Sequence, residues 1–184
     1  RAFTIKNLKD FMNQLLLADT FDYFSVSEAT ITTFVTFSID GSLHPDFYDS
    51  DTAARLKAAG KSQVRWSGIK SWCYSVIRGK RTPVSFRFIF LLPEDRSRAL
   101  CESSQAPVEP DNIAGLFLNI HYNGTALTVT TGTSLKIFTL DKTLEHAFDN
   151  AVQKFLLEHG IDFERNEKMA LYKNFTNLET LDFT

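Results

Sequence analysis

The second half of the chain joins apolar, strand-like stretches by very short connections, and this strongly restricts the fold. Three strands are predicted there, at residues 115–122, 126–131 and 134–139. Asn123-Gly124 has the composition of a two-residue hairpin turn, and Gly132 is expected to close the second turn. Strands connected this tightly must pair antiparallel, because a parallel crossover needs a dozen or more residues.

Helices with a single apolar stripe accompany these strands. Apolar residues recur three or four positions apart, which places them on one side of a helix, in three segments: 7–18, 93–103 and 142–159. Each stripe needs one sheet face to cover it. The chain also contains 17 Phe, whose rings require a broad interface between helices and sheet. We therefore predict an α+β fold, an antiparallel sheet with packed helices.

The remaining pattern predicts one domain with an insertion. Further strands are expected at 2–5, within 22–39 with a turn near 28–30, and at 84–92, and further helices at 52–59 and 66–78. A chain of 184 residues suits a single domain, which we place at residues 1–160. Residues 44–83 are expected to form a basic helical insertion. The apolar pattern fades after Gly160, so residues 161–184 are predicted to be a loosely packed C-terminal extension.

The order of the elements indicates a weak internal repeat. Residues 2–43 and 86–139 are both expected to run strand, helix, then closely spaced strands, a β-α-β-β unit. Within the second unit, Leu127-Thr-Val-Thr-Thr-Gly132 and its flanking strands resemble the three-strand core of a DNA sliding-clamp domain. This resemblance implies a two-repeat, clamp-like sheet. The helices that would line the DNA in a clamp carry mixed charge here, which argues against a ring around DNA.

A second resemblance spans residues 3–160. It rests on five segments: 8–16, 28–34, 37–41, 79–86 and 130–141. In these segments the chain resembles an uncharacterised family of Firmicutes proteins of unknown function. The resemblance implies a bacterial protein and no particular activity.

Charge is distributed unevenly along the chain. The net charge is −2, yet the stretch from Arg55 to Arg98 contains eleven basic residues and only two acidic ones. A basic block in an otherwise acidic chain attracts phosphates or an acidic protein. The alternative is that these bases pair with carboxylates inside the fold. The candidate polyanion-binding residues are Lys61, Arg65, Lys70, Arg78, Lys80 and Arg81.

Three of these bases flank Gly79, the expected end of the helix at 66–78. Glycine allows the chain to turn sharply, so Arg78, Lys80 and Arg81 are expected to spread toward one ligand. Lysine and arginine heads contact phosphates without distinguishing bases. Binding of nucleic acid would therefore be modest, indifferent to sequence and strongly dependent on salt.

Motifs for catalysis are not evident. The sequence has no phosphate-binding glycine loop, dinucleotide fingerprint or nucleophile elbow. Asp40, His44, Asp46 and Asp49 are the one local group with metal-ligand chemistry, but these residue types are equally typical of turns. Cys73 and Cys101 are expected to be buried packing residues. We therefore expect no catalytic residue, no metal and no cofactor.

Three functions follow, in order of preference. The first is a cytoplasmic, non-enzymatic binding module that engages nucleic acid or another polyanion through the basic segment. The second is a protein–protein interaction or self-associating scaffold domain, which would form homo-oligomers. The third is a metal-dependent enzyme that uses the 40–49 loop. The longest strongly apolar run, at about 88–93, is far too short for a membrane span, and no leader is visible before Phe3, so no membrane partner is expected.

Overall fold

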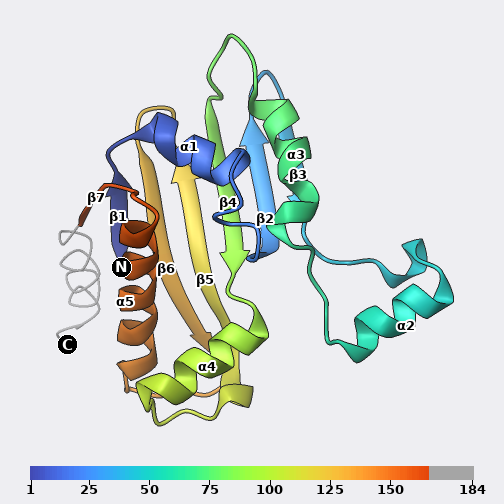
Figure 1. Ribbon diagram of the computed structural model, residues 1–184, viewed down its shortest axis with the longest axis vertical. Helices are drawn as coiled ribbons and strands as arrows, with labels where there is room; N and C mark the ends of the chain where they lie inside the picture. Colours follow the sequence, from blue (N-terminus) through green and yellow to red (C-terminus); the bar gives the residue numbers. More distant parts are fainter. Residues whose placement is uncertain (166–184) are drawn as a thin grey trace, which may run out of the picture.

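A seven-stranded sheet forms one layer of the protein, which a computed structural model describes for residues 1–165 (Figure 1). Its order is β3-β2-β4-β5-β6-β1-β7, and every neighbouring pair is antiparallel. The strands are β1 (Ala2–Ile5), β2 (Ser25–Thr32), β3 (Thr36–Asp40), β4 (Ser85–Leu91), β5 (Ile113–Tyr122), β6 (Leu127–Leu135) and β7 (Phe163–Arg165). The predicted α+β class is confirmed.

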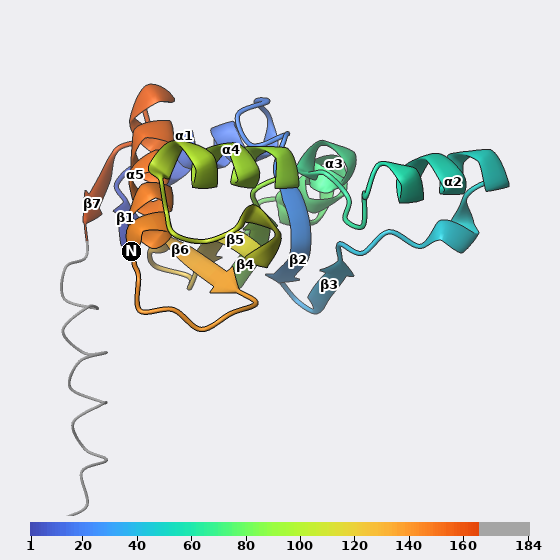
Figure 2. The ribbon, with the colours of Figure 1, turned by 90° about the horizontal axis from the view of Figure 1, so that it is seen from below.

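Helices make the second layer, on one face of this sheet. The covering helices are α1 (Leu8–Leu16), α3 (Trp66–Ile77), α4 (Glu94–Ser104) and α5 (Thr143–Glu158). Figure 2 shows all four on the same side of the strands, as expected for helices with one apolar stripe each. The opposite face of the sheet is covered by no helix of residues 1–165.

The helix α2 (Ser50–Ala58) does not join this layer. Together with the short 3₁₀ helix at Pro45–Phe47 it stands away from the sheet in both views (Figures 1 and 2). We call residues 42–63 the arm. Its base is a short ladder in which Leu43 N donates to Ser62 O at 2.8 Å and Val64 N donates to Gly41 O at 2.8 Å. The predicted insertion at 44–83 is thus divided. Its first part lies in the arm, which extends away from the sheet, whereas α3 packs on the sheet and buries Trp66.

Aromatic rings fill the space between the two layers. Phe86, Phe88 and Phe90 alternate along β4 toward the helices and are buried, while Arg87 between them points to the open face. The ring of Trp66 lies 5.0 Å from both Phe88 and Phe90. The many Phe residues of the chain are thus accommodated at a helix–sheet interface, as predicted.

The β2–β3 turn lies later than predicted. The expected turn near 28–30 is wrong, because β2 runs on to Thr32 and the turn falls at residues 33–35. Ala29 and Ile31 are buried and pair with Phe88 and Phe86 of β4, so the strand gains core contacts by continuing. Glu28, a polar residue that suggested a turn, lies on the open face of the sheet, away from this core. Its carboxylate forms an ion pair there with Arg87.

The two strands predicted at 126–131 and 134–139 are one strand in the structure. β6 continues from Leu127 to Leu135, and Gly132 pairs with Phe117 instead of closing a turn. A long neighbour explains this, since β5 has ten residues and offers ladder hydrogen bonds along its whole length. Residues 136–142 then connect β6 to α5 without regular structure.

Both halves of the chain have the predicted strand–helix–strand–strand order, but their first strands have different neighbours. β1 lies between β6 and β7, whereas β4 lies between β2 and β5. The domain also extends past residue 160, because Ile161 is buried and β7 pairs with β1. The rest of the predicted C-terminal extension, residues 166–184, lies outside the described residues.

Candidate polyanion-binding surface

The helix α3 separates five of the six predicted binding residues into two groups and contains the sixth, Lys70. Lys61 and Arg65 precede the helix, and Arg78, Lys80 and Arg81 follow it. A helix of twelve residues is about 18 Å long. The structure therefore does not bring all six bases into one cluster.

Lys70, in the middle of α3, is already used by the fold. Its Nζ donates to Asp22 Oδ1 at 2.6 Å and to Ala18 O at 2.7 Å, and its side chain is only 19% exposed. These contacts tie α3 to the segment that follows α1. Lys70 thus has partners inside the fold, and the proposed binding surface below does not include it.

Lys61 and Arg65 lie in a region of mixed charge. Both line a hollow of about 950 Å³ between the arm and the start of α4, and Glu94, Asp95 and Asp111 line it too. Arg65 Nη1 also donates to Tyr23 O at 3.4 Å. Arg98 and Lys136 line the same hollow, so this end of α3 combines bases with carboxylates, whereas the connection that follows α3 contains no Asp or Glu.

The three bases after α3 are arranged differently. Arg78, Lys80 and Arg81 are all exposed. Within residues 1–165 the ion pairs involve other groups, and these three take part in none. The alternative of internal pairing therefore holds for Lys70 and for two bases of the sheet and α4, namely Arg87 with Glu28 and Arg98 with Glu94 and Asp111. It does not hold for the group at 78–81.

Three connections meet at this end of the sheet. The first is the β2–β3 tip at 33–35, the second the α3–β4 connection at 78–84, and the third the β5–β6 turn at 123–126. Val84 N donates to Thr32 O at 2.9 Å, and a Cβ on Gly124 would lie 2.9 Å from Val84 O, so the α3–β4 connection lies next to each of the other two (Figure 1, top). We call residues 33–35, 78–84 and 123–126 the three-loop end. They contain three bases and no Asp or Glu.

Exposed apolar side chains accompany these bases. Phe34 is 91% exposed, and Val84 and Val35 are also largely exposed. The ring of Phe37, at the start of the edge strand β3, lies 6.3 Å from that of Phe34 in an edge-to-face arrangement. Sequence analysis missed Phe34 because the alternating pattern from Ile31 to Phe37 is the same for a buried strand and for a hairpin tip. Its position next to the turn is the signal that distinguishes them.

The loop that suggested a metal site is held by its own hydrogen bonds. Asp40 Oδ1 accepts from Ser42 N at 2.9 Å, and Asp49 accepts from both N and Oγ1 of Thr52 at 2.8 Å to cap α2. These bonds lower the pKa of both carboxyls. Among residues 1–165, no three His, Cys, Asp or Glu side chains are placed to hold a metal ion. The loop thus has the turn and capping roles typical of these residues.

Both cysteines are buried and free, as predicted. Burial raises the pKa of the Cys73 thiol to about 12, and the thiol of Cys101 also has a raised pKa for the same reason. Since the thiolate is the reactive form, neither group is suited to nucleophilic chemistry.

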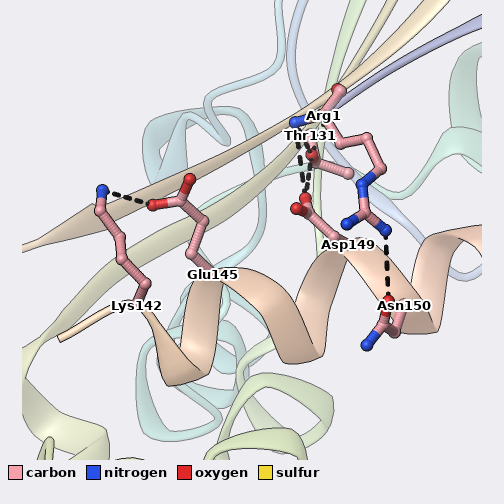
Figure 3. A network of polar contacts seen from close by, with 6 residues as sticks. All are labelled: Arg1, Thr131, Lys142, Glu145, Asp149 and Asn150. Atoms are coloured by element: carbon pink, nitrogen blue, oxygen red, sulfur yellow. Dashed lines mark hydrogen bonds and ion pairs between the residues drawn. The ribbon is translucent and has the colours of Figure 1, made fainter. Parts of the chain in front are cut away.

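A separate polar network fastens α5 to the sheet (Figure 3). The buried carboxylate of Asp149 accepts a hydrogen bond from Thr131 Oγ1 of β6 and lies 3.5 Å from the backbone nitrogen of Arg1. Arg1 Nη1 donates to Asn150 at 3.2 Å. Every group in this cluster has a partner inside the fold, which indicates a structural role.

Comparisons with known proteins supply a family and no activity. No curated protein and no solved structure matches the chain, so the sliding-clamp and Firmicutes resemblances stay predictions. None of the helices in residues 1–165 has the length and apolar character that crossing a bilayer requires. A family model matches residues 14–164, in agreement with the expected relation to proteins of unknown function. The chain therefore belongs to the family of unknown function DUF5721.

Proposed function

We propose that this protein is a cytoplasmic, non-enzymatic binding module that holds nucleic acid through its three-loop end. Arg78, Lys80 and Arg81 would contact the phosphates. One observation carries the proposal: these three exposed bases lie in a group of connections that contains no Asp or Glu, and they form no ion pair within residues 1–165. The two free cysteines fit a reducing compartment.

Electrostatics determines what such a surface can do. Carboxylates within ion-pair distance offset the charge of six basic side chains in residues 1–165, whereas no ion pair offsets the three bases of the three-loop end. Three phosphate contacts release about three counterions, so the logarithm of affinity should fall with the logarithm of salt concentration with a slope of about −2 to −3. Binding through phosphates would also be indifferent to base sequence.

A charge-reversal experiment tests the proposal. In a gel shift at about 50 mM salt, where such contacts are strong, the wild type should retain DNA or RNA and the double variant Lys80→Glu/Arg81→Glu should not. The matched control is Lys57→Glu/Lys61→Glu on the arm, which changes the net charge equally and should still bind. Circular dichroism checks that each variant keeps its fold. No shift of the wild type at micromolar protein, or equal loss in both variants, would contradict the proposal.

Self-association is the second candidate. It is favoured by β3, an edge strand that pairs only with β2 within the described sheet and exposes Phe37. An open edge with an apolar side chain is a template for pairing with a second copy. Sedimentation equilibrium over a hundredfold range of concentration tests this, with Phe37→Lys expected to abolish any dimer. A constant monomer mass throughout would exclude the candidate.

A further inference from the structure

We infer that the three-loop end selects single-stranded nucleic acid, with the ring of Phe34 as a platform on which an unpaired base stacks. This inference rests on the proposed function. Its starting point is that Phe34 is 91% exposed although it belongs to a residue type that is usually buried. Among the ring–ring contacts of residues 1–165, Phe34 makes one, an edge-to-face contact with Phe37.

The ring lies within reach of Arg81, the first of the three bases back along the chain from Val84. Val84 N donates to Thr32 O, which joins the two segments. Phe34 lies two residues beyond Thr32 in the chain, and Arg81 lies three residues before Val84. At the reach of an extended chain, the two Cα atoms are no more than about 25 Å apart. A few nucleotides of a single strand cover this span, so one strand can contact the bases through its phosphates and the ring through a base.

Single strands fit this chemistry better than duplexes do. In a duplex the faces of the bases are stacked on each other, and a protein ring cannot reach them without unstacking the helix. An unpaired base presents its whole face, and every base stacks on an aromatic ring whatever its identity. Val35 and Val84, in the same group of connections, also expose apolar side chains.

Aromatic rings beside basic groups also occur where proteins touch anionic membranes. The positive charge of the three-loop end attracts a nucleic acid and an anionic membrane alike. The experiment below therefore includes anionic vesicles as a probe, which distinguishes membrane binding from binding of nucleic acid.

The experiment measures fluorescence anisotropy with four probes at about 50 mM salt. They are a labelled oligothymidylate of about 20 nucleotides, the corresponding blunt duplex, inorganic polyphosphate as competitor, and vesicles of phosphatidylglycerol and phosphatidylcholine. The variants are Phe34→Ala, Phe34→Trp and the control Phe47→Ala, whose ring is 84% exposed on the arm. Circular dichroism confirms that all are folded.

The inference predicts a distinct pattern. The wild type should bind the oligothymidylate at least about tenfold more tightly than the duplex, because stacking adds to the phosphate contacts. Phe34→Ala should weaken binding of the single strand by about tenfold and leave the duplex unchanged, while Phe47→Ala changes neither. Phe34→Trp should retain affinity, and its added tryptophan fluorescence should be quenched when oligothymidylate binds.

Other outcomes separate this inference from the proposed function. Equal affinity for single strand, duplex and polyphosphate, unaffected by Phe34→Ala, would overturn the inference and leave the proposed function standing. Binding of vesicles but not of oligothymidylate, lost in Phe34→Ala, would overturn both and identify a membrane surface. No binding of any probe would also overturn both.

Discussion

The indole of Trp66 is fully buried and connects α3 to two other elements. Its ring packs on Phe88 and Phe90 of β4, and its Nε1 donates to Leu15 O in α1 at 2.6 Å. We expect Trp66→Phe to keep an aromatic ring but to leave this carbonyl without a donor, at a cost of about 1–3 kcal/mol. Urea unfolding followed by far-UV circular dichroism measures the loss. Trp72→Phe, at a side chain that is 70% exposed, is the control and should change stability by less than about 0.5 kcal/mol; equal effects would contradict the prediction.

Single residues were predictable where their role is local. Asn7, at the start of the helix predicted at 7–18, is a residue type that favours helix caps, and its Oδ1 accepts from Asp10 N at 3.1 Å. Such a cap depends on only a few neighbouring residues. Lys70 and Arg78 look alike in sequence, yet one is paired with Asp22 and the other is exposed and outside the ion pairs of residues 1–165. That difference depends on contacts between residues far apart in the chain, which local patterns do not contain.

Gly41 permits the arm to leave the sheet. A Cβ at this position would lie 1.8 Å from Val26 O, a backbone atom that cannot move aside cheaply. We therefore expect Gly41→Ala to destabilise the protein by at least about 2 kcal/mol and to loosen the ladder at the base of the arm. Thermal unfolding and limited proteolysis of the arm measure these effects.

Gly132→Ala is the matched control for this prediction. A Cβ there would meet Phe117 Cβ at 3.7 Å, an ordinary packing distance, and φ is not positive. The change should be neutral or slightly stabilising, because alanine has less freedom than glycine in the unfolded chain. Similar losses for both variants would show that the close approach at Gly41 is not the cause.

At the level of elements, the helices were predicted better than the strands. The helix at 142–159 matches α5 to within one residue at each end, because its apolar stripe is long and regular. The β2–β3 turn and the end of β6 were misplaced, since a strand ends where its neighbour stops pairing and not where its own residues change character. The split of the candidate site has a different cause: α3, predicted at 66–78 and found at Trp66–Ile77, lies between the bases that precede it and those that follow it.

Acid should destabilise the whole molecule. The pKa values of four carboxyls are lowered in the folded state by hydrogen bonds, from Thr30 and Arg87 to Glu28, from Ser42 to Asp40, from Thr52 to Asp49, and from Lys142 to Glu145. The unfolded chain therefore binds protons more readily than the folded one near pH 4. The resulting stability is complete above about pH 5 and is lost as the pH falls through the lowered values.

Urea midpoints at pH 7, 5 and 3 measure this dependence. We expect similar midpoints at pH 7 and 5 and a lower one at pH 3. Glu28→Gln, which removes one of the four groups, should reduce the difference between pH 5 and pH 3. A midpoint that rises toward pH 3 would contradict the assignment of these carboxyls.

The strand order has a consequence for how the protein is made. β1 is synthesised early, but its neighbours in the sheet are β6 and β7, and Phe3 pairs with Val129. At about 5–20 residues per second, a ribosome needs on the order of ten seconds to supply that partner. During this time the ring of Phe3, fully buried at the end, has no sheet to cover it. A partial sheet can assemble meanwhile, because β2, β3, β4 and β5 are neighbours of one another. Until β6 is made, the edge of this partial sheet at β5 stays open. The unpaired β1 and the open edge then need protection from aggregation.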